Sequence, residues 1–485
     1  MMNTEGRGLV LDENLLFEQS QAGRVGYSLS GLDVPEVMPD NRLLRDEIAE
    51  FPELSEVDVV RHYTRLSTWN YGVDSGFYPL GSCTMKYNPK INEMVARLPG
   101  FTDIHPQTPE ALNQGALELM YNLQCDLGEI SGFPAITLQP AAGAQGEFTG
   151  MLMIRAWHEA NGQKRHKVII PDTAHGTNPA SSALCGYEVI TVASDGILSK
   201  EAVAAVMDDD VAALMVTNPN TLGLFESDIR GICDLVHERG GLVYSDGANL
   251  NAMMGISRPG DIGIDVMHFN LHKTFSTPHG GGGPGSGPVG VTEKLQPFLP
   301  VPYVVKTADG YELEYDCPQS IGRMKSFYGH FGILVRAYSY ILSMGGEGLK
   351  RASELAVLNA NYIRARLEGE YELPNQQRSL HEVVFSEDAL ANGCHTLDVA
   401  KRLIDYGYHP PTIYFPLVVH GALMIEPTET ESKQTIDEFC DALLAIARES
   451  RDNPELLKQA PVRAKVQRLD ETAAARKPKL RWEQQ

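Results

Sequence analysis

From about residue 135 to residue 295, short apolar runs rich in β-branched residues alternate with longer segments of helical periodicity. The runs that we expect to form strands are 136–139, 167–171, 188–192, 212–217, 242–245, 266–270 and 289–292. Between them we expect helices, which include 147–159, 200–207 and 228–239. Strands that alternate with helices are typical of a mainly parallel sheet covered by helices. The pattern therefore predicts an α/β fold for this part of the chain.

The pattern changes on both sides of this region and divides the chain into four parts. Residues 1–85 have scattered apolar positions without a clear sheet, so we expect an N-terminal arm and interface segment. The large α/β domain covers 86–345, and a helical run followed by alternating runs predicts a smaller α+β domain over 346–455. Residues 456–485 are rich in Lys, Arg, Gln and Ala without apolar periodicity, which indicates a C-terminal tail.

Length and charge narrow the class of protein. A chain of 485 residues should contain more than one core, because single cores stop growing at about 250–300 residues. The 41 basic and 63 acidic residues give a net charge of −22, which argues against nucleic acid or an anionic membrane as the main partner. No run approaches the roughly 20 apolar residues of a membrane helix. We find no export signal and expect a cytoplasmic protein.

The seven cysteines are scattered, and none forms a CxxC pair. This spacing predicts neither a disulfide framework nor a metal site. Most of these cysteines are expected to be small buried apolar residues.

One apolar run ends in a lysine, Lys273, just before a glycine-rich turn. Burial of an ammonium group is costly unless the group is paired or neutralised. A Schiff base with an aldehyde cofactor such as pyridoxal phosphate would remove that cost, and Asp246 could pair with the pyridinium nitrogen of the cofactor. A solvated loop lysine beside a flexible turn explains this stretch equally well.

Several polar residues follow the expected strands, and ligands of parallel α/β sheets bind at the carboxyl ends of strands. These residues are Asp172, His175, Asn218, Asp246 and Lys273, which we expect to surround one site. His175 could stack on a pyridine ring, although a histidine satisfied in the core explains this single residue better. Asp246 could equally cap a turn.

A phosphate group could bind where small residues over 139–147 join a strand to a helix. The amide groups and the dipole at the amino end of a helix favour an anion. His272, with Ser276 or Thr277, could add contacts to the phosphate. A tight turn without a ligand fits the segment nearly as well.

Four motifs resemble those of one family, the pyridoxal phosphate subunit of glycine dehydrogenase (decarboxylating), or P-protein of the glycine cleavage system. They are YPLGSCTMKYNP at 78–89, PDTAHGTNP at 171–179, NLHKTF at 270–275 with the glycine run that follows it, and MIEPTETE at 424–431. The resemblance extends from about residue 60 to residue 435.

The resemblance implies a fold type I pyridoxal phosphate enzyme and gives roles to individual residues. Lys273 would form the Schiff base, Asp246 would pair with the pyridinium, and His175 would stack on the ring. Ala248 would lie against the opposite face of the ring. Ala144 and Gln145 would offer backbone amides to the phosphate.

The resemblance also implies a reaction and partners. Glycine would lose CO2, and its aminomethyl group would pass to the lipoyl arm of the H-protein. Lys273, once freed, could transfer protons. A chain of this length resembles the second, lysine-bearing subunit, which forms a heterotetramer with two copies of a companion that lacks the lysine.

Two other classes of function stay open at this point. Lys273 and Asp246 alone also fit another fold type I enzyme, such as an amino acid decarboxylase, an aminotransferase or a cysteine desulfurase. An aminotransferase would use an arginine for the substrate carboxylate, and Arg323 is a candidate. The chain could instead be a non-catalytic structural subunit, but Lys273 argues against that.

Overall fold

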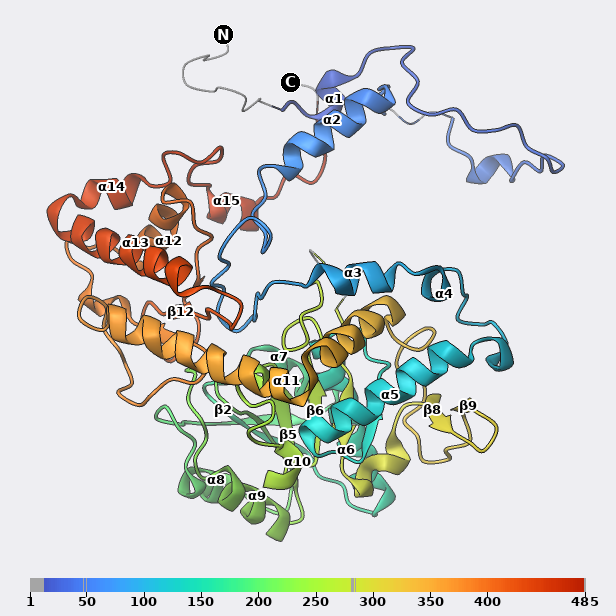
Figure 1. The fold of residues 1–485 in the computed structure, drawn as a ribbon, viewed down its shortest axis with the longest axis vertical. Helices are drawn as coiled ribbons and strands as arrows, with labels where there is room; N and C mark the ends of the chain where they lie inside the picture. Colours follow the sequence, from blue (N-terminus) through green and yellow to red (C-terminus); the bar gives the residue numbers. More distant parts are fainter. Residues whose placement is uncertain (1–12, 47, 49, 281–282, 284, 484–485) are drawn as a thin grey trace. The chain divides into compact units, whose positions relative to one another are not determined.

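The computed structural model describes residues 13–46, 48, 50–280, 283 and 285–483 (Figure 1). The chain divides into two compact units, Met1–Ser75 and Gly76–Gln485. The first unit contains α1 (Leu16–Gln19), the short 3-10 helix η1 (Asn41–Leu43) and α2 (Glu56–Ser67). Many of its large apolar side chains are exposed, including Val25, Tyr27 and Leu29. Exposed apolar surface of this kind is typical of an interaction segment, so its role at an interface stays a prediction.

The second unit contains a seven-stranded sheet in the order β1-β7-β6-β5-β4-β2-β3. Its strands are β1 (Ala135–Thr137), β2 (Lys167–Pro171), β3 (Glu188–Val192), β4 (Val211–Thr217), β5 (Leu242–Gly247), β6 (Val266–Phe269) and β7 (Val289–Val291). β7 runs antiparallel to its two neighbours β1 and β6, and the other strand pairs of this sheet are parallel. All seven expected strands are present, with ends shifted by at most two residues, so the prediction of a mainly parallel α/β sheet is confirmed.

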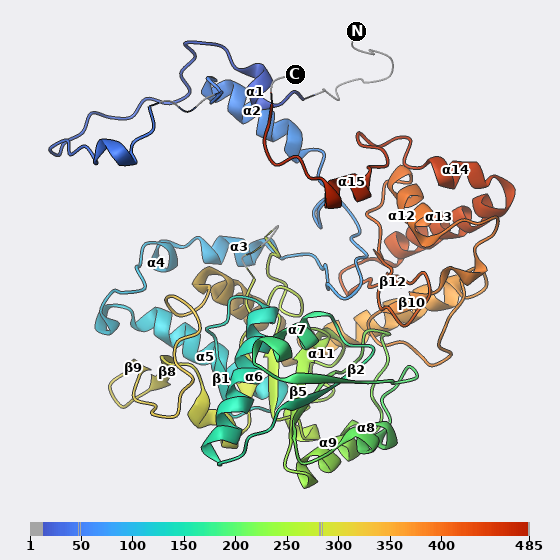
Figure 2. The same ribbon diagram turned by 180° about the vertical axis from the view of Figure 1, so that it is seen from behind.

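Helices cover both faces of this sheet (Figure 2). Successive side chains of a strand point to opposite faces, and the side chains on both faces of the central strands are buried. Leu214 and Val243 pack into one apolar cluster with residues of α5 (Gln114–Ser131) and α9 (Ile229–Glu238). Met215 and Tyr244, the next residues along, pack into another cluster with α6 (Gly143–Ala160). The strands are therefore buried on both faces, which is characteristic of parallel sheets.

Further short elements complete the large domain. These are α3 (Lys90–Ala96), α4 (Pro99–Thr102), η2 (Glu110–Leu112), α7 (Thr177–Leu184), α8 (Lys200–Val206), η3 (Leu250–Ala252), α10 (Pro259–Ile262), η4 (Glu293–Phe298), β8 (Tyr303–Lys306) and β9 (Tyr311–Glu314). The long helix α11 (Phe331–Leu367) is interrupted at Gly345, where φ is 59°. Within the described part of the chain, no helix is both long and apolar enough to cross a membrane.

The carboxyl-terminal part is the smaller α+β region expected from the sequence. Its three-stranded antiparallel sheet has the order β10-β12-β11. The elements are β10 (Val383–Phe385), η5 (Glu387–Ala389), α12 (Thr396–Asp405), β11 (Thr412–Ile413), β12 (Leu423–Ile425), α13 (Lys433–Asp452), α14 (Pro454–Gln459) and α15 (Glu471–Arg476). The four-part domain boundaries given above stay a prediction.

The motif at 78–89, called here the 78–89 loop, packs along this smaller sheet. Leu80 forms an isolated β-bridge with Ile425, and the backbone N–H of Glu426 donates to the carbonyl of Pro79 at 3.2 Å. The hydroxyl of Thr412 donates to the carbonyl of Gly81 at 2.8 Å. These contacts attach the loop to the small sheet.

Candidate active site

The carboxyl ends of β4, β5 and β6 and the amino end of α6 surround a cavity of about 220 Å³. The residues that line it are Ser82, Ala142, Gly143, Ala144, Glu147, His175, Thr177, Thr217, Thr221, Asp246, Ala248, Asn249, His268, Asn270, His272 and Lys273. Six of the seven cofactor-site residues named from the sequence are among them. The fold thus brings together residues that are far apart in the chain.

The cavity lining does not include Asp172, Asn218 or Gln145, which were also named from the sequence. Asp172 accepts hydrogen bonds from the backbone and hydroxyl of Ser194, and Asn218 accepts one from the backbone of Glu226. The expectation that all five strand-end residues surround one site was therefore wrong for these two, because their side chains anchor neighbouring turns instead. The side chain of Gln145 bonds to backbone groups outside the cavity, and the contact of its own amide with a phosphate stays a prediction.

Asp246 is a buried carboxylate held in place by three groups. Its oxygens accept hydrogen bonds from the backbone N–H of Ala248 at 2.9 Å and from the amide of Asn178 at 3.0 Å. The Nε2 atom of His268 lies 3.3 Å from Oδ1. Burial raises the pKa of Asp246, but His268, Lys273 and these hydrogen bonds outweigh burial and lower its pKa below the usual value. Asp246 is therefore ionised at neutral pH and can face a cationic nitrogen.

His268 is a site residue that the sequence reasoning missed. It is buried in β6 directly opposite Asp246 of β5. Its Nδ1 lies 2.7 Å from the hydroxyl of Tyr244, and its Nε2 lies 2.8 Å from the amide nitrogen of Asn270. Burial lowers the pKa of His268. The sequence shows this residue as a histidine within an apolar run, but only the strand register pairs it with Asp246.

Glu147 is a second missed residue, and it lies on the first turns of α6. Its carboxylate accepts hydrogen bonds from Thr177 at 2.7 Å, from Asn178 at 3.1 Å and from Ser181 at 3.3 Å. Burial and the negative charge of Asp246 raise the pKa of Glu147 to about 7, although these hydrogen bonds oppose the shift. Glu147 therefore changes its charge near neutral pH.

His175 is exposed and reaches the cavity from the turn before α7. Its Nδ1 lies 2.8 Å from the hydroxyl of Thr177, which connects it to Glu147. Its ring meets the ring of Phe415 edge-on, with centroids 5.7 Å apart. Local burial lowers the pKa of His175, so a neutral ring is favoured. A flat, neutral imidazole at the cavity wall fits a stacking role.

Lys273 extends from the turn after β6, and its Nζ donates a hydrogen bond to the carbonyl of Ser82 at 2.8 Å. The acceptor belongs to the 78–89 loop, so this hydrogen bond links the turn after β6 to the loop that packs on the small sheet. In the same loop, burial raises the pKa of the Cys83 thiol to about 11. Cys83 is half-buried and is therefore a neutral thiol at pH 7.

His272 and His279 are neutral imidazoles near the cavity wall. Burial lowers their pKa values to about 3 and about 4, and the two rings meet edge-on at 5.2 Å. The Nδ1 of His272 accepts a hydrogen bond from the backbone of Ser286. A contact of His272 with a phosphate stays a prediction.

The residues around the cavity fit pyridoxal phosphate. No side chain of the described residues caps the amino end of α6, where its first amides can meet a phosphate. The buried Thr217 Oγ1 and Asn249 Oδ1 lack a hydrogen-bond partner among the described residues, although both residues line the cavity. Lys273 offers an amine and Asp246 an ionised carboxylate. Aldehyde, pyridine nitrogen and phosphate thus each have a matching group.

Two groups of described residues bring metal-ligand atoms within 4.8 Å of one another. One is Glu147, Asp246 and His268 at the cavity, and the other is His381, Glu382 and Glu426. In the first group His268 and Asp246 already contact each other directly. The expectation that the protein needs no metal stays a prediction.

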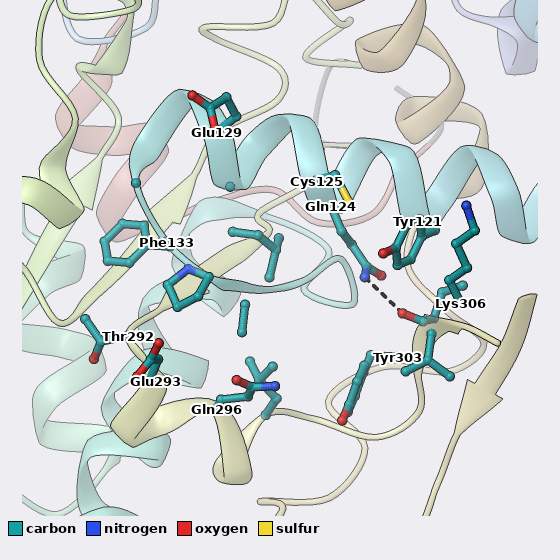
Figure 3. A pocket seen from close by; sticks show the side chains of 18 of the residues that line it. Tyr121, Gln124, Cys125, Glu129, Phe133, Thr292, Glu293, Gln296, Tyr303 and Lys306 are labelled. Carbon is teal, nitrogen blue, oxygen red and sulfur yellow. Dashed lines mark hydrogen bonds between the residues drawn. The ribbon is translucent and has the colours of Figure 1, made fainter. Parts of the chain in front are cut away.

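A larger cavity, of about 1000 Å³, lies between α5, η4 and β8 (Figure 3). Across it, the side-chain amide of Gln124 donates a hydrogen bond to the carbonyl of Val304 at 3.1 Å. None of the strand-end residues named from the sequence lines it. The smaller cavity, and not the larger one, contains strand-end residues named from the sequence, so we take it as the candidate site.

The sheet topology and this site define a class, the fold type I pyridoxal phosphate enzymes. A solved structure of glycine decarboxylase (P-protein) of the glycine cleavage system superposes with a TM-score of 0.71 at 19% identity, covering 84% of this chain and 93% of the other. Glutamate decarboxylase of Lactobacillus brevis superposes with a TM-score of 0.64 at 14% identity, covering 87% and 96%. These similarities confirm the predicted fold class.

Sequence comparison identifies the family within that class. Residues 352–463 match the family model described as the glycine dehydrogenase C-terminal domain. A protein of Caldanaerobacter subterraneus subsp. tengcongensis named probable glycine dehydrogenase (decarboxylating) subunit 2 is 60% identical over 97% of this chain and 98% of its own length. The chain therefore belongs to the family of glycine dehydrogenase (decarboxylating) subunit 2.

Proposed function

We propose that this chain is the pyridoxal phosphate-bearing subunit of glycine dehydrogenase (decarboxylating) and that it removes CO2 from glycine. The main support is one spatial relationship: Lys273, Asp246 and the amino end of α6 border the same cavity. Family membership supports the same reaction.

Pyridoxal phosphate, when bound, would supply an aldehyde for amines and a ring that accepts the electrons left behind as CO2 departs. Asp246 would accept a hydrogen bond from the pyridine nitrogen and keep the proton on it. Because negative charge develops in the transition state, a proton held there lowers the barrier. The Nζ of Lys273 would attach the cofactor and afterwards move protons. His175 and Ala248 would hold the ring between them, and the amides of Ala144 and Gln145 would bind the phosphate.

The proposal includes partners. The words "subunit 2" in the names of the relatives imply a companion subunit. We infer a heterotetramer with two copies of each chain, and transfer of the aminomethyl group to the lipoyl arm of the H-protein. The exposed apolar residues of the first unit support an interface there. We also propose that the assembly works in the cytoplasm.

The alternative fold type I reactions are not favoured. An aminotransferase would use an arginine for the substrate carboxylate, but no arginine of the described residues lines the cavity. The Arg323 guanidinium instead donates to the carbonyl of Phe327 at 3.1 Å and lies over the ring of Tyr328.

The deciding experiment measures exchange of labelled bicarbonate into the carboxyl group of glycine. With the companion subunit and lipoylated H-protein present, the wild-type chain should catalyse this exchange, and K273A should abolish both the exchange and the near-visible absorbance of the purified protein. Absence of exchange in the complete wild-type mixture would contradict glycine decarboxylation. Unchanged absorbance of K273A would contradict the role of Lys273 and would favour the hypothesis of a non-catalytic structural subunit.

A further inference from the structure

The segment Ser82 to Thr84 of the 78–89 loop has an unusual backbone. Ser82 has a φ of 61° and Thr84 a φ of 46°, both in the left-handed region. Residues other than glycine rarely adopt this region, and a β-branched residue such as threonine does so least readily. Such conformations persist only where the surroundings hold them, and they are common at functional sites.

Two buried glutamates hold this segment. Glu382 Oε2 accepts a hydrogen bond from the backbone N–H of Ser82 at 2.8 Å. Glu426 accepts two from Thr84, one from its backbone N–H at 2.8 Å and one from its hydroxyl at 2.6 Å. Glu382 comes directly before β10 and Glu426 directly after β12, and these strands pair antiparallel. Both side chains therefore lie at the same end of the β10–β12 pair.

This arrangement is costly as a simple loop anchor. Both glutamates are fully buried, and burial of carboxyl groups is unfavourable without good partners. Burial, together with the nearby Glu426, raises the pKa of Glu382 well above its usual value, and burial also raises the pKa of Glu426. Glu382 Oε1 and both ring nitrogens of His381 have no hydrogen-bond partner among the described residues, and His381 Nε2 lies 3.9 Å from Glu382 Oε1. A glutamine could accept the hydrogen bond from Ser82 without the cost of a buried carboxyl group.

The segment that they hold contacts the lysine on which the proposed function rests. The carbonyl of Ser82 accepts the hydrogen bond from Lys273 Nζ. The backbone conformation of Ser82 fixes the direction of this carbonyl. The N–H of the same residue donates a hydrogen bond to Glu382. A continuous chain of hydrogen bonds thus joins the small sheet to the lysine.

We propose that Glu382 and Glu426 are positioning residues for Lys273, because they hold Ser82–Thr84 so that the Ser82 carbonyl orients the lysine amine toward the cavity. The inference deepens the proposed function and rests on Lys273 being the residue that attaches the cofactor. Neither glutamate lines the cavity, so their action passes through the loop.

The experiment compares the rate at which Lys273 captures pyridoxal phosphate. Full-length protein freed of cofactor is mixed with pyridoxal phosphate, samples are reduced with borohydride at intervals, and peptide mass spectrometry measures the adduct at Lys273. E382A and E426A remove the acceptors of the loop amides and should slow capture by about tenfold or more, as expected when a buried backbone donor is left without its acceptor. E382Q keeps an acceptor for Ser82 and should capture at nearly the wild-type rate.

The matched control is D405A. Asp405 is also buried and accepts two backbone amides, those of Val462 and Arg463, each at 2.8 Å, but it lines no part of the cavity. D405A should lower the melting temperature and leave the capture rate unchanged. If E426A does not fold, T84V replaces it, because T84V removes one donor to Glu426 and keeps the carboxylate.

The outcomes separate the inference from the function. Capture at the wild-type rate by E382A and E426A, or by E382A and T84V, overturns the positioning role. An E382Q protein as slow as E382A also overturns it, since the hydrogen bond to Ser82 would then not be the cause. If the wild-type chain forms no adduct at Lys273, the proposed function fails first, whatever the glutamate variants do.

Discussion

Asp246 and His268 occupy paired positions on neighbouring parallel strands, and Asp246 Oδ1 lies 3.3 Å from His268 Nε2. The histidine is buried and also contacts Tyr244 and Asn270. This network fixes the direction of the carboxylate, so that it cannot rotate away from the cavity. An ionised and oriented acid at this point is what a protonated ring nitrogen requires.

We expect D246N to reduce the glycine–bicarbonate exchange rate by about a hundredfold or more, as loss of a charge-stabilising group in an active site commonly does. The amide is similar in size to the carboxylate but lacks its negative charge, so a proton on the ring nitrogen is no longer favoured. The measurement is the exchange rate at saturating glycine. D172N, a change at another strand end outside the cavity, should keep the wild-type rate. A D246N rate within about twofold of wild type would contradict the role of Asp246.

Glu147 makes stability depend on pH in the cofactor-free protein. Burial and Asp246 raise its pKa from the ordinary 4.5 to about 7. Between these values the folded chain binds more protons than the unfolded chain, so this group lowers the free energy of unfolding as pH rises through the window. The loss should reach about 3 kcal/mol at most.

The test compares wild type and E147Q by urea unfolding at several pH values across this window. E147Q cannot ionise, so its stability relative to wild type should increase from pH 4.5 to pH 7 and become constant above it. A difference between the two proteins that does not change with pH would show that Glu147 titrates normally.

Much of the fold could be predicted because it depends on local pattern. β4 is apolar up to its last residue and β5 begins with the apolar run 242–244, and each strand lies between turn and helix signals, so their existence and parallel pairing could be inferred from order alone. Lys273 and Asp246 were accessible for the same reason, since each follows a strand that the pattern defines.

The rest of the site depends on contacts between distant segments. In the sequence, Glu147 is an ordinary charged residue near the start of an expected helix. Only the fold brings it into contact with Thr177 and Asn178. Glu382 and Glu426 stand next to apolar strands and give no sign that they meet the 78–89 loop. Asp172 shows the opposite error, because the strand-end rule does not tell which side chain anchors a turn.

Gly143 begins α6 at the cavity wall, and we expect G143A to weaken pyridoxal phosphate binding by about tenfold or more. A Cβ atom there would collide with the side-chain oxygen of Asn270, and the side-chain nitrogen of the same residue contacts His268. The collision displaces either the first turn of α6 or Asn270, and both line the cavity. The measurement is a titration of cofactor-free protein followed by absorbance.

G115A is the matched control, since a Cβ at Gly115 of α5 meets no atom within 4 Å. It should bind the cofactor as wild type does and gain slightly in stability from the better helix former. Equal cofactor affinity of G143A and G115A would mean that the amino end of α6 does not contact the cofactor.

Lys86, in the 78–89 loop, forms a buried ion pair with Glu429. We expect the loss of only one partner of this pair to destabilise the protein strongly. Its Nζ donates to Glu429 at 2.8 Å, to Asn251 at 2.8 Å and to Tyr340 at 3.1 Å. Burial lowers the pKa of Lys86, but Glu429 and Tyr340 outweigh burial and raise its pKa, so it stays charged. K86M leaves Glu429 buried without its cation and should lower the free energy of unfolding by about 3–5 kcal/mol. The double variant K86M/E429Q removes both charges and should recover most of that loss, because no unpaired charge is left buried and both desolvation costs are gone. Urea unfolding of the two single variants and the double variant gives the coupling energy, and a double variant as unstable as the sum of the singles would show that the two charges act independently.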